Sequence, residues 1–370
     1  MRRLLVSKLV PGMKVGRNVY GKRGEIWLAR GAVLTRRYID RLVELEIPAI
    51  YVDDGLLGDV DIEGAISEET RQHAVQQVKA LLSEAATPKT GAISPPPAVY
   101  RTVEEIVRQV MSNPNAIYNL LDIRAEDEYL FYHSVNVCIL ATVAGANLGW
   151  NREQLEELAL GALLHDVGKV RVPPEILNKP GELTRREFEE VKKHTVYGEE
   201  MLEMMPPEVR RIARSHHERL DGTGYPDGIS DIPAAVQLTG LADVYDALTA
   251  DRVYRQASPP NEAFEMIAGT GDFWFDHLLV QAFLFNIAAF PVGSIVSLSS
   301  GAVAVVVENK PGHSLYPKVR VLFAPTGERA VPAPEFWCHE EGVGVLKALT
   351  QDEVTALGIT PYDTDPHVPA

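Results

Sequence analysis

Cysteine is nearly absent from this 370-residue sequence, which contains only Cys138 and Cys338 and no CxxC motif. A disulfide framework and a cysteine-ligated zinc site are therefore excluded. Basic residues are also scarce, because 36 Lys and Arg stand against 51 Asp and Glu and the formal net charge is −15. A field of that sign repels long nucleic acids, so an anionic substrate would need a strong local positive charge.

The sequence also lacks a clear secretory or membrane segment. Lys8 interrupts the N-terminal apolar run before a signal sequence could form. Residues 277–307 carry no Asp, Glu, Lys or Arg, but polar residues, proline and glycine interrupt them. This pattern favours a buried helix to about Phe290 followed by a strand over a membrane-spanning helix. We therefore expect a cytoplasmic protein with no membrane span.

Periodicity and composition divide the chain into four parts. Glycine turns between short apolar runs predict a small α+β domain over residues 1–55. A polar helix from Glu68 to Ala85 and a proline-rich stretch predict a linker over residues 56–98. Helical periodicity dominates residues 99–290, whereas residues 291–370 show period two and β-branched runs. The expected fold class is mainly α, with a helical domain flanked by small β-containing modules.

Helix start and stop signals refine the helical part. Apolar residues at helical spacing predict a helix from Arg152 to Asp166, and Gly168 stands where it would end. Thr184 begins a capping-box motif for a helix that would run to Met205. Pro207 suits the first turn of the next helix.

Histidines cluster in one part of the chain. Five of the ten lie between residues 133 and 217, and two aspartates lie beside or after them: His133, His165, His194, His216, His217, Asp166 and Asp243. A set of nitrogen and oxygen ligands without thiolate suits iron, manganese or zinc in two-metal hydrolytic sites. It argues against copper(I) and iron–sulfur chemistry.

Helical spacing places several of these histidines on apolar faces. His133 shares a face with Val137 and Leu140. His194 and His216 align with apolar residues in the same way. One such histidine is more often an ordinary core residue than a ligand. Five together would each need a hydrogen-bond partner if no metal were present, so the pattern favours a metal centre.

Two motifs carry a family resemblance. His165-Asp166, followed by Lys169, and the run HHERLDGTGYP from His216 to Pro226 resemble the HD-GYP family, whose members hydrolyse cyclic di-GMP. The likeness covers about residues 99–290, and the long second motif is highly specific. Two further segments, 243–249 and 251–255, are similar to later motifs of the family. Residues 1–55 resemble, more weakly, a domain often found ahead of HD-GYP domains.

The resemblance implies an HD-type helical bundle and two divalent metal ions, iron or manganese. One ion would be held by His133, His165, Asp166 and Asp243. The other would be held by Asp166, His194, His216 and His217. Asp166 would bridge them. Some members bind a third ion through a glutamate four residues before the first histidine, where this sequence has Tyr129, with Glu128 one position off.

Substrate contacts are expected from a few further residues. Lys169 lies one turn from the ligands and could stabilise the phosphorane or the departing oxygen. Arg252 and Arg255 are three residues apart and would present their guanidinium groups to one side, either for phosphate or as a solvated basic face. Two departures from the family pattern, Thr195 for proline in the motif of the third ligand and Val253 for proline between the arginines, remove no ligand.

The segment from Gly222 to Pro226 has turn chemistry. Gly224 and Tyr225 would line the substrate cleft or dock a signalling partner, for example a GGDEF-type protein, unless the segment is a plain turn. Asp221 is expected to bond the backbone of this loop. Asp246, three residues after Asp243, is expected either to act behind the ligands or to be structural.

These features predict a phosphodiesterase of bacterial second-messenger signalling. A hydroxide bridging the metals would attack cyclic di-GMP to give pGpG and, by continuation, GMP. A phosphohydrolase for another cyclic dinucleotide or nucleotide, and a non-catalytic regulator that binds nucleotide or a partner, remain alternatives. A homodimer is compatible with the sequence. The metals, Lys169, Arg252 and Arg255 would make a positive pocket inside a negative protein.

Overall fold

The structure is a computed structural model of residues 1–370. It describes the chain except for residues 22–23, 46, 54, 58–59, 61–63, 87–90, 119–128, 180, 251–256 and 360–370.

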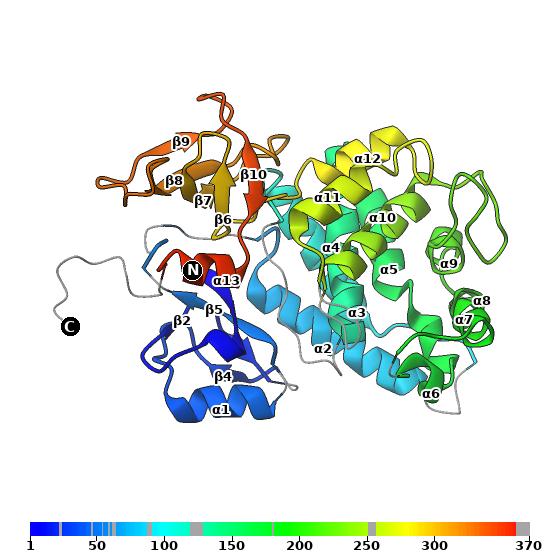
Figure 1. Ribbon diagram of the computed structural model, residues 1–370. Helices are drawn as coiled ribbons and strands as arrows, with labels where there is room; N and C mark the ends of the chain where they lie inside the picture. The colour runs from blue at the N-terminus through cyan, green and yellow to red at the C-terminus, as the bar shows by residue number, and fades with distance from the viewer. Residues whose placement is uncertain are drawn as a thin grey trace.

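The N-terminal unit is a small α+β structure, drawn in dark blue in Figure 1. Its described elements are β1 (Arg2–Leu5), η1 (Val6–Lys8), β2 (Lys14–Val15), β3 (Val19–Tyr20), β4 (Ile26–Leu28), α1 (Arg36–Glu44) and β5 (Ala49–Asp53). Strand β5 lies between β1 and β2 in an antiparallel sheet, and β3 pairs with β4. The Thr35 side chain caps α1, which buries Ile39 and Leu42.

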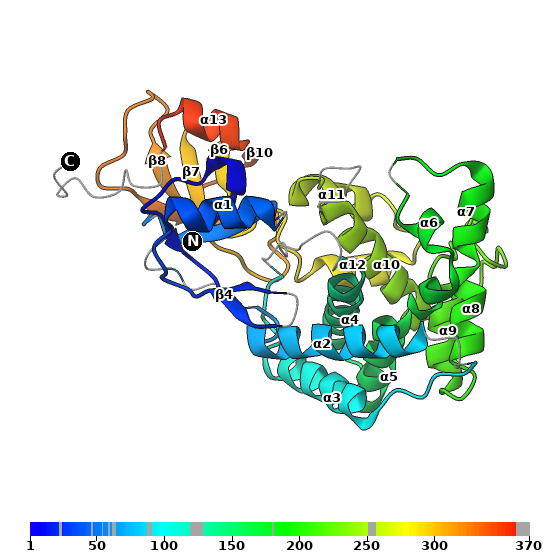
Figure 2. The ribbon, with the colours of Figure 1, turned by 90° about the horizontal axis from the view of Figure 1, so that it is seen from below.

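The helical unit fills the other half of the molecule (Figures 1 and 2). Its described helices are α2 (Glu68–Ala85), α3 (Pro97–Ser112), α4 (Tyr129–Asn147), α5 (Arg152–Leu164), η3 (Val167–Arg171), α6 (Pro174–Leu177), α7 (Arg185–Lys192), α8 (His194–Met201), α9 (Pro207–Ser215), α10 (Ala234–Thr249), α11 (Pro260–Ala268) and α12 (His277–Leu284). Helix α4 is central, because α2, α3, α5, α10 and α12 all pack against it. The predicted mainly α fold class is confirmed.

Helix α4 is also apolar enough to resemble a membrane span. Among the described residues, Leu130–Asn147 is the one stretch of helix with the length and hydropathy to cross a bilayer, and 72% of it is buried inside the protein. This is the pattern of a core helix packed on all sides. The uncharged stretch discussed above instead forms α12, which ends at Leu284 and not at Phe290, and strand β6 (Ile295–Leu298).

The C-terminal unit is a single antiparallel sheet of five strands in the order β10-β6-β7-β8-β9, followed by α13 (Gln351–Ala356). The remaining strands are β7 (Val303–Glu308), β8 (Lys318–Phe323), β9 (Glu335–Trp337) and β10 (Val345–Ala348). Both β-containing units lie on the same side of the helical unit (Figures 1 and 2). They are joined by an apolar cluster in which Leu56 and Leu57 meet Ile295, Val305 and Val354.

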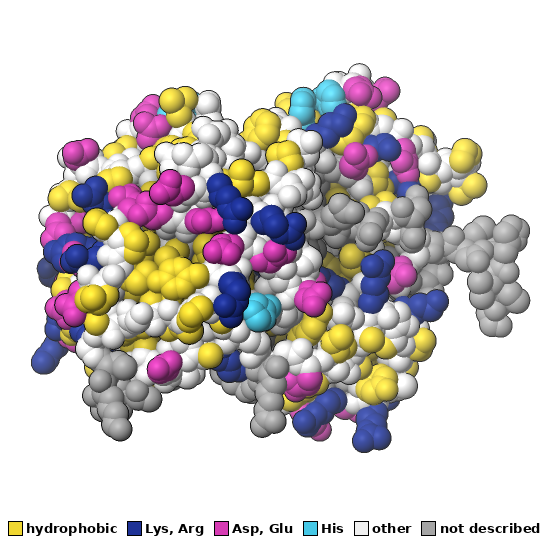
Figure 3. All heavy atoms as spheres, turned by 180° about the vertical axis from the view of Figure 1, so that it is seen from behind, with side chains coloured by type: hydrophobic (Ala, Val, Ile, Leu, Met, Phe, Trp, Pro, Cys, Tyr) yellow, Lys and Arg dark blue, Asp and Glu magenta, His cyan; other side chains and the backbone are white. Residues whose placement is uncertain are grey.

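Charges of both signs are mixed on the surface. On the face shown in Figure 3, Lys and Arg side chains are interspersed with Asp and Glu and do not gather into a basic stripe. A basic stripe is the usual footprint of long nucleic acids.

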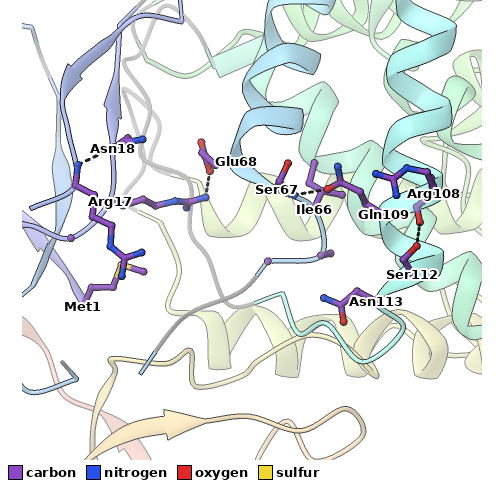
Figure 4. A pocket seen from close by; sticks show the side chains of 14 residues that line it. Met1, Arg17, Asn18, Ile66, Ser67, Glu68, Arg108, Gln109, Ser112 and Asn113 are labelled. Carbon is purple, nitrogen blue, oxygen red and sulfur yellow. Dashed lines mark hydrogen bonds and ion pairs between the residues drawn. The ribbon is translucent and has the colours of Figure 1, made fainter. Parts of the chain in front are cut away.

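Helix α2 belongs to the helical core, although its polar sequence suggested part of a linker. Val75, Val78 and Leu82 are buried in the same apolar cluster as α3 and α4. At its start, α2 also reaches the N-terminal unit, where Arg17 forms an ion pair with Glu68 beside a cavity of about 500 Å³ (Figure 4). We therefore propose that the helical unit begins near residue 65.

Candidate metal centre

The seven predicted ligands converge in the middle of the helical unit. They come from α4 (His133), from the end of α5 (His165, Asp166), from the start of α8 (His194), from the end of α9 (His216, His217) and from α10 (Asp243). Within each of three groups, one ligand atom per residue lies within 4.8 Å of the others. These groups are His133–His165–Asp243, His194–His216–His217 and His165–Asp166–His216. The third group links the other two.

Local structure explains why the two halves of the centre meet. A capping box at Asn151 starts α5, and His165 is the residue that ends it. The chain then turns through η3, which packs against α8. A Cβ atom on Gly168 would lie 1.9 Å from the carbonyl oxygen of His194, so only glycine permits this approach.

Hydrogen bonds from the outer ring nitrogens orient the histidines. The Nδ1 atoms of His165 and His194 donate to the carbonyls of Ala162 and Val191, each at 2.7 Å. His216 Nδ1 donates to carbonyls of the preceding turn at 3.1 Å. Because a carbonyl only accepts, Nδ1 carries the proton and the lone pair of Nε2 faces the centre.

His133 is oriented by a carboxylate. Its Nδ1 donates to Asp246 Oδ2 at 2.7 Å, and its Nε2 lies 3.1 Å from Asp243 Oδ1. This contact places Asp246 behind the candidate ligand His133, where its spacing from Asp243 led us to expect it.

Asp166 lies between the two groups. One of its oxygens, Oδ2, is 3.3 Å from His165 Nε2 and 3.6 Å from His133 Nε2, and it also forms an ion pair with Lys169. The other, Oδ1, is 3.4 Å from His194 Nε2. Both Asp166 Oδ1 and His165 Nε2 are buried and have no hydrogen-bond partner among the described residues. Buried polar atoms are rarely left in this way, and a cation between them would satisfy both.

Burial keeps the inner histidines neutral. It lowers the pKa of His194 to about 4, and it lowers those of His216 and His217 well below the usual value. Burial opposes the ionisation of Asp166, but Lys169 and the neighbouring His165 together hold the pKa of this carboxyl well below its usual value. Neutral imidazoles and ionised carboxylates are the forms that bind metal, so the residues fit divalent ions.

The loop after the last two histidines packs against the centre. Tyr225 stacks on His217, with ring centroids 4.5 Å apart and an angle of 26° between the planes. A Cβ atom on Gly224 would lie 2.4 Å from Glu218 Cα, so the close approach requires glycine. Asp221 bonds Thr223 N at 2.9 Å, which confirms its predicted role in the loop.

Some predicted residues lie outside the described part of the chain. These are Arg252, Arg255 and Glu128. Tyr129 is the first residue of α4, but its side chain is not described.

Glu218 is a residue of the site region to which the sequence assigned no role. It is 1% exposed, and its carboxylate accepts the backbone N–H groups of Asp227 (2.7 Å), Gly228 (3.1 Å) and Ile229 (3.1 Å). It therefore ties the far end of the loop to the segment that carries His216 and His217. Its place between the two histidines and the loop was visible in the motif, but its backbone partners were not.

The sequence of this chain is similar to those of several known proteins. Residues 115–279 match the HD domain family. The cyclic di-GMP phosphodiesterase PA4108 of Pseudomonas aeruginosa is 37% identical over 235 residues, which are 62% of this chain and 56% of that protein. The 3′3′-cGAMP-specific phosphodiesterase 1 of Vibrio cholerae is 36% identical over 167 residues, or 44% of this chain and 38% of that protein. The chain thus spans about half or less of the length of these relatives.

One solved structure has a similar fold. The HDG"Y"P protein Bd1817 of Bdellovibrio bacteriovorus gives a TM-score of 0.50 at 18% identity, covering 76% of this chain and 97% of that one. Fold and site together define an HD domain. Residues 115–279 of the helical unit match this family, and the resemblance to HD-GYP proteins that the motifs indicated is confirmed.

Proposed function

We propose that this protein is a metal-dependent phosphodiesterase that hydrolyses cyclic di-GMP to pGpG and, by continuation, to GMP. The observation that carries the proposal is the convergence of seven nitrogen and oxygen ligands in two groups that share Asp166. The relative from P. aeruginosa, which bears the name of this activity, supports the choice of substrate.

HD domain proteins bind divalent metals, and the histidines and aspartates of this chain form clusters suited to them. We assign two ions, iron or manganese. His133, His165, Asp166 and Asp243 would hold one ion, and Asp166, His194, His216 and His217 would hold the other. When bound, such a pair of ions supplies an activated water and neutralises phosphate charge.

The other residues of the site bind and orient the substrate. Lys169 Nζ contacts Asp166 Oδ2, so its ammonium lies at the edge of the centre, where it can stabilise negative charge on the phosphate or on the departing oxygen. We assign phosphate binding to Arg252 and Arg255 by their spacing. Gly224 and Tyr225 would line the substrate site beside His217.

A second candidate substrate is another cyclic dinucleotide. It is favoured by the V. cholerae relative, whose name specifies 3′3′-cGAMP. The ligands determine the reaction type and leave base recognition to other side chains. A non-catalytic regulator is less favoured, because the chain retains all seven ligands.

The deciding experiment uses the full-length protein, purified without oxygen and loaded with Mn²⁺ or Fe²⁺. It is incubated with cyclic di-GMP, 3′3′-cGAMP and cyclic di-AMP, and the products are separated by chromatography. We expect pGpG to form fastest. Metal-loaded protein that turns over none of the three would overturn the proposal, and faster turnover of 3′3′-cGAMP would favour the second candidate.

We also propose a cytoplasmic location, a GGDEF-type partner that docks on residues 222–226, and a homodimer. The first is supported by the burial of α4, the most membrane-like helix among the described residues. The domain boundaries at residues 55 and 290 remain proposals as well, with the helical unit beginning near residue 65 in place of residue 99.

A further inference from the structure

Arg71 is a buried arginine that lies outside the part of the chain matched to the HD domain. It stands in the first turns of α2, only 3% exposed, whereas the family match begins at residue 115. A charged side chain is almost never buried to this extent unless it is paired. Its contacts therefore indicate what it does.

Arg71 starts a chain of hydrogen bonds that ends at a metal ligand. Its guanidinium donates to Asn136 Oδ1. The other end of that amide, Nδ2, donates to Asp246 Oδ1 at 2.7 Å. The second carboxylate oxygen, Asp246 Oδ2, accepts the Nδ1 proton of His133 at 2.7 Å. All four residues are 3% exposed or less.

The chemistry of these groups allows one order of donors and acceptors. A guanidinium only donates, so the amide oxygen of Asn136 must face Arg71 and its NH₂ group must face Asp246. An ionised carboxylate only accepts, so His133 must carry its proton on Nδ1. Nε2 is then the ring nitrogen that faces the centre, 3.1 Å from Asp243 Oδ1, and it offers a lone pair to a metal when the ring is neutral.

We infer that Arg71 is a positioning residue for the metal ligand His133. It fixes the amide orientation of Asn136, and Asn136 and His133 then hold the two oxygens of Asp246 in place. The inference rests on the proposed metal centre and not on the identity of the substrate. It adds a residue from α2 to a site whose ligands all come from α4 and later elements.

The test replaces Arg71 in the full-length protein. Arg71→Met keeps most of the apolar stem and removes every donor, whereas Arg71→Lys keeps one charged donor group. Leu81→Ala is the matched control, because Leu81 is a buried residue of the same helix (3% exposed) that loses only packing. Mn²⁺ affinity is measured by calorimetry, and thermal unfolding is measured on the metal-free proteins.

Loss of a partner behind a metal ligand typically weakens metal binding about 10- to 100-fold, and we expect this for Arg71→Met. Arg71→Lys should recover part of the affinity. Leu81→Ala should lower the unfolding temperature while leaving Mn²⁺ affinity within about twofold of wild type. Because Arg71 acts on His133 through Asp246, Arg71→Met should add little further loss in the Asp246→Asn background.

Three results would decide against the inference. Wild-type Mn²⁺ affinity in Arg71→Met would show that Arg71 is only structural. Equal loss in Leu81→Ala would show that affinity merely follows stability. Failure of the wild type to bind Mn²⁺ would instead remove the proposed metal centre itself, and the inference with it.

A separate observation concerns an exposed ring next to the centre. Phe188, on α7, is 43% exposed, and its ring packs edge-on against Tyr225 with centroids 6.3 Å apart. Tyr225 in turn stacks on His217. Lys192 Nζ lies 5.0 Å from the Phe188 ring centroid and 5.4 Å from that of Tyr225. The two rings and the ammonium thus form a surface continuous with the ligands.

We propose that Phe188 and Lys192 form a nucleotide subsite, in which Phe188 stacks on a base and Lys192 contacts a phosphate. Every nucleobase offers a π-face that can stack on an aromatic side chain, so such a contact does not depend on which base is present. The adjacent ammonium donates one hydrogen bond to Glu189 Oε1 at 2.9 Å, and its other hydrogens can be donated to a phosphate oxygen. This subsite deepens the proposed function and depends on it.

The test compares Phe188→Leu and Phe188→Tyr with Phe285→Leu, which changes a ring of similar exposure (45%) after α12. We expect Phe188→Leu to raise the KM for cyclic di-GMP about tenfold with kcat within about threefold, consistent with the loss of one stacking contact. Phe188→Tyr and Phe285→Leu should resemble wild type. An unchanged KM in Phe188→Leu would overturn the subsite alone, whereas a wild type without turnover would overturn the proposed function and the subsite together.

Discussion

Asp166 is the side chain on which both ligand groups depend. It contacts His165 and His133 through one oxygen and His194 through the other. We expect Asp166→Ala to reduce turnover by at least about a thousandfold, because both ligand groups lose their shared oxygen donor. Metal content and steady-state rates measure this effect.

Asp221→Ala provides the matched control for that substitution. Asp221 is an exposed carboxylate of the same region whose bonds go to Thr223, so this variant should retain its metal. Retention of half the wild-type rate by Asp166→Ala would contradict the bridging role.

The two thiols should be inert in the native protein. Burial raises the pKa of Cys138 to about 12 and that of Cys338 to about 11. The nucleophilic thiolate is therefore nearly absent at pH 8 and becomes abundant only as the pH approaches these values. A colorimetric thiol reagent should label neither cysteine at pH 8 before denaturation and both after it. Rapid labelling of the native protein would contradict this prediction.

At the residue scale, the clustering of the seven candidate ligands could be predicted because their type and spacing carry the signal. Histidines on apolar helical faces and the family motifs pointed to residues that the structure brings together. Arg71 and Glu218 could not be assigned in this way. The first contacts Asn136, 65 positions away, and the second contacts backbone amides, which every residue possesses. Neither of these two contacts produces a pattern of residue types that can be recognised in the local sequence.

The loop that follows His217 depends on Glu218 for its far attachment. Glu218→Ala removes three charge-assisted hydrogen bonds and leaves backbone amides without their acceptor. We expect the free energy of unfolding to fall by about 2–4 kcal/mol and amide exchange at residues 227–229 to accelerate. Denaturant unfolding and hydrogen-exchange mass spectrometry measure the two effects. Unchanged exchange at these residues would show that the loop is held by other contacts.

The contact between η3 and α8 depends on Gly168. In Gly168→Ala the new methyl group would overlap the His194 carbonyl oxygen, which is backbone and has little freedom to move. We expect a loss of at least about 3 kcal/mol in stability, together with weaker metal binding as His194 is displaced. Gly91→Ala, where nothing lies within 4 Å of the new atom, is the control and should be near neutral. Wild-type stability in Gly168→Ala would show that α8 can shift freely.

At the scale of elements, the sequence predicted starts better than ends. The caps at Thr184 and the proline at position 207 begin helices where expected. The helix expected to run to Met205 is interrupted at Lys193, between α7 and α8. Helix α12 ends early because Asn286 is tied to residues 114–118 by bonds that span some 170 positions. Periodicity cannot report such long-range bonds.

Removal of metal should destabilise the whole molecule. Without cations the helical core contains the buried carboxylates Asp166 and Asp243 and, among the described residues, the buried ring nitrogen His165 Nε2 without a hydrogen-bond partner. A ligand that binds only the folded state adds about 2.7 kcal/mol when present at 100 times its Kd. We therefore expect a chelator to lower the unfolding temperature by several degrees and Mn²⁺ to restore it. Identical unfolding curves with chelator and with Mn²⁺ would contradict the metal centre.

Net charge also acts at this scale. The chain carries −15 overall, yet Lys169 and the proposed cations concentrate positive charge at one buried place. On the face shown in Figure 3, the mixed charges form no basic stripe that could bind a long polyanion. A small phosphodiester is therefore better matched to this distribution than DNA or RNA.

The position of α2 affects how the protein can be divided. A fragment that began at residue 115, where the family match starts, would contain all seven ligands and the loop with Tyr225. It would lack Arg71, and it would expose to water the side of α4 that Val75, Val78 and Leu82 help to cover. The smallest active fragment of this chain should therefore start before Glu68, well ahead of residue 115, where the family match begins.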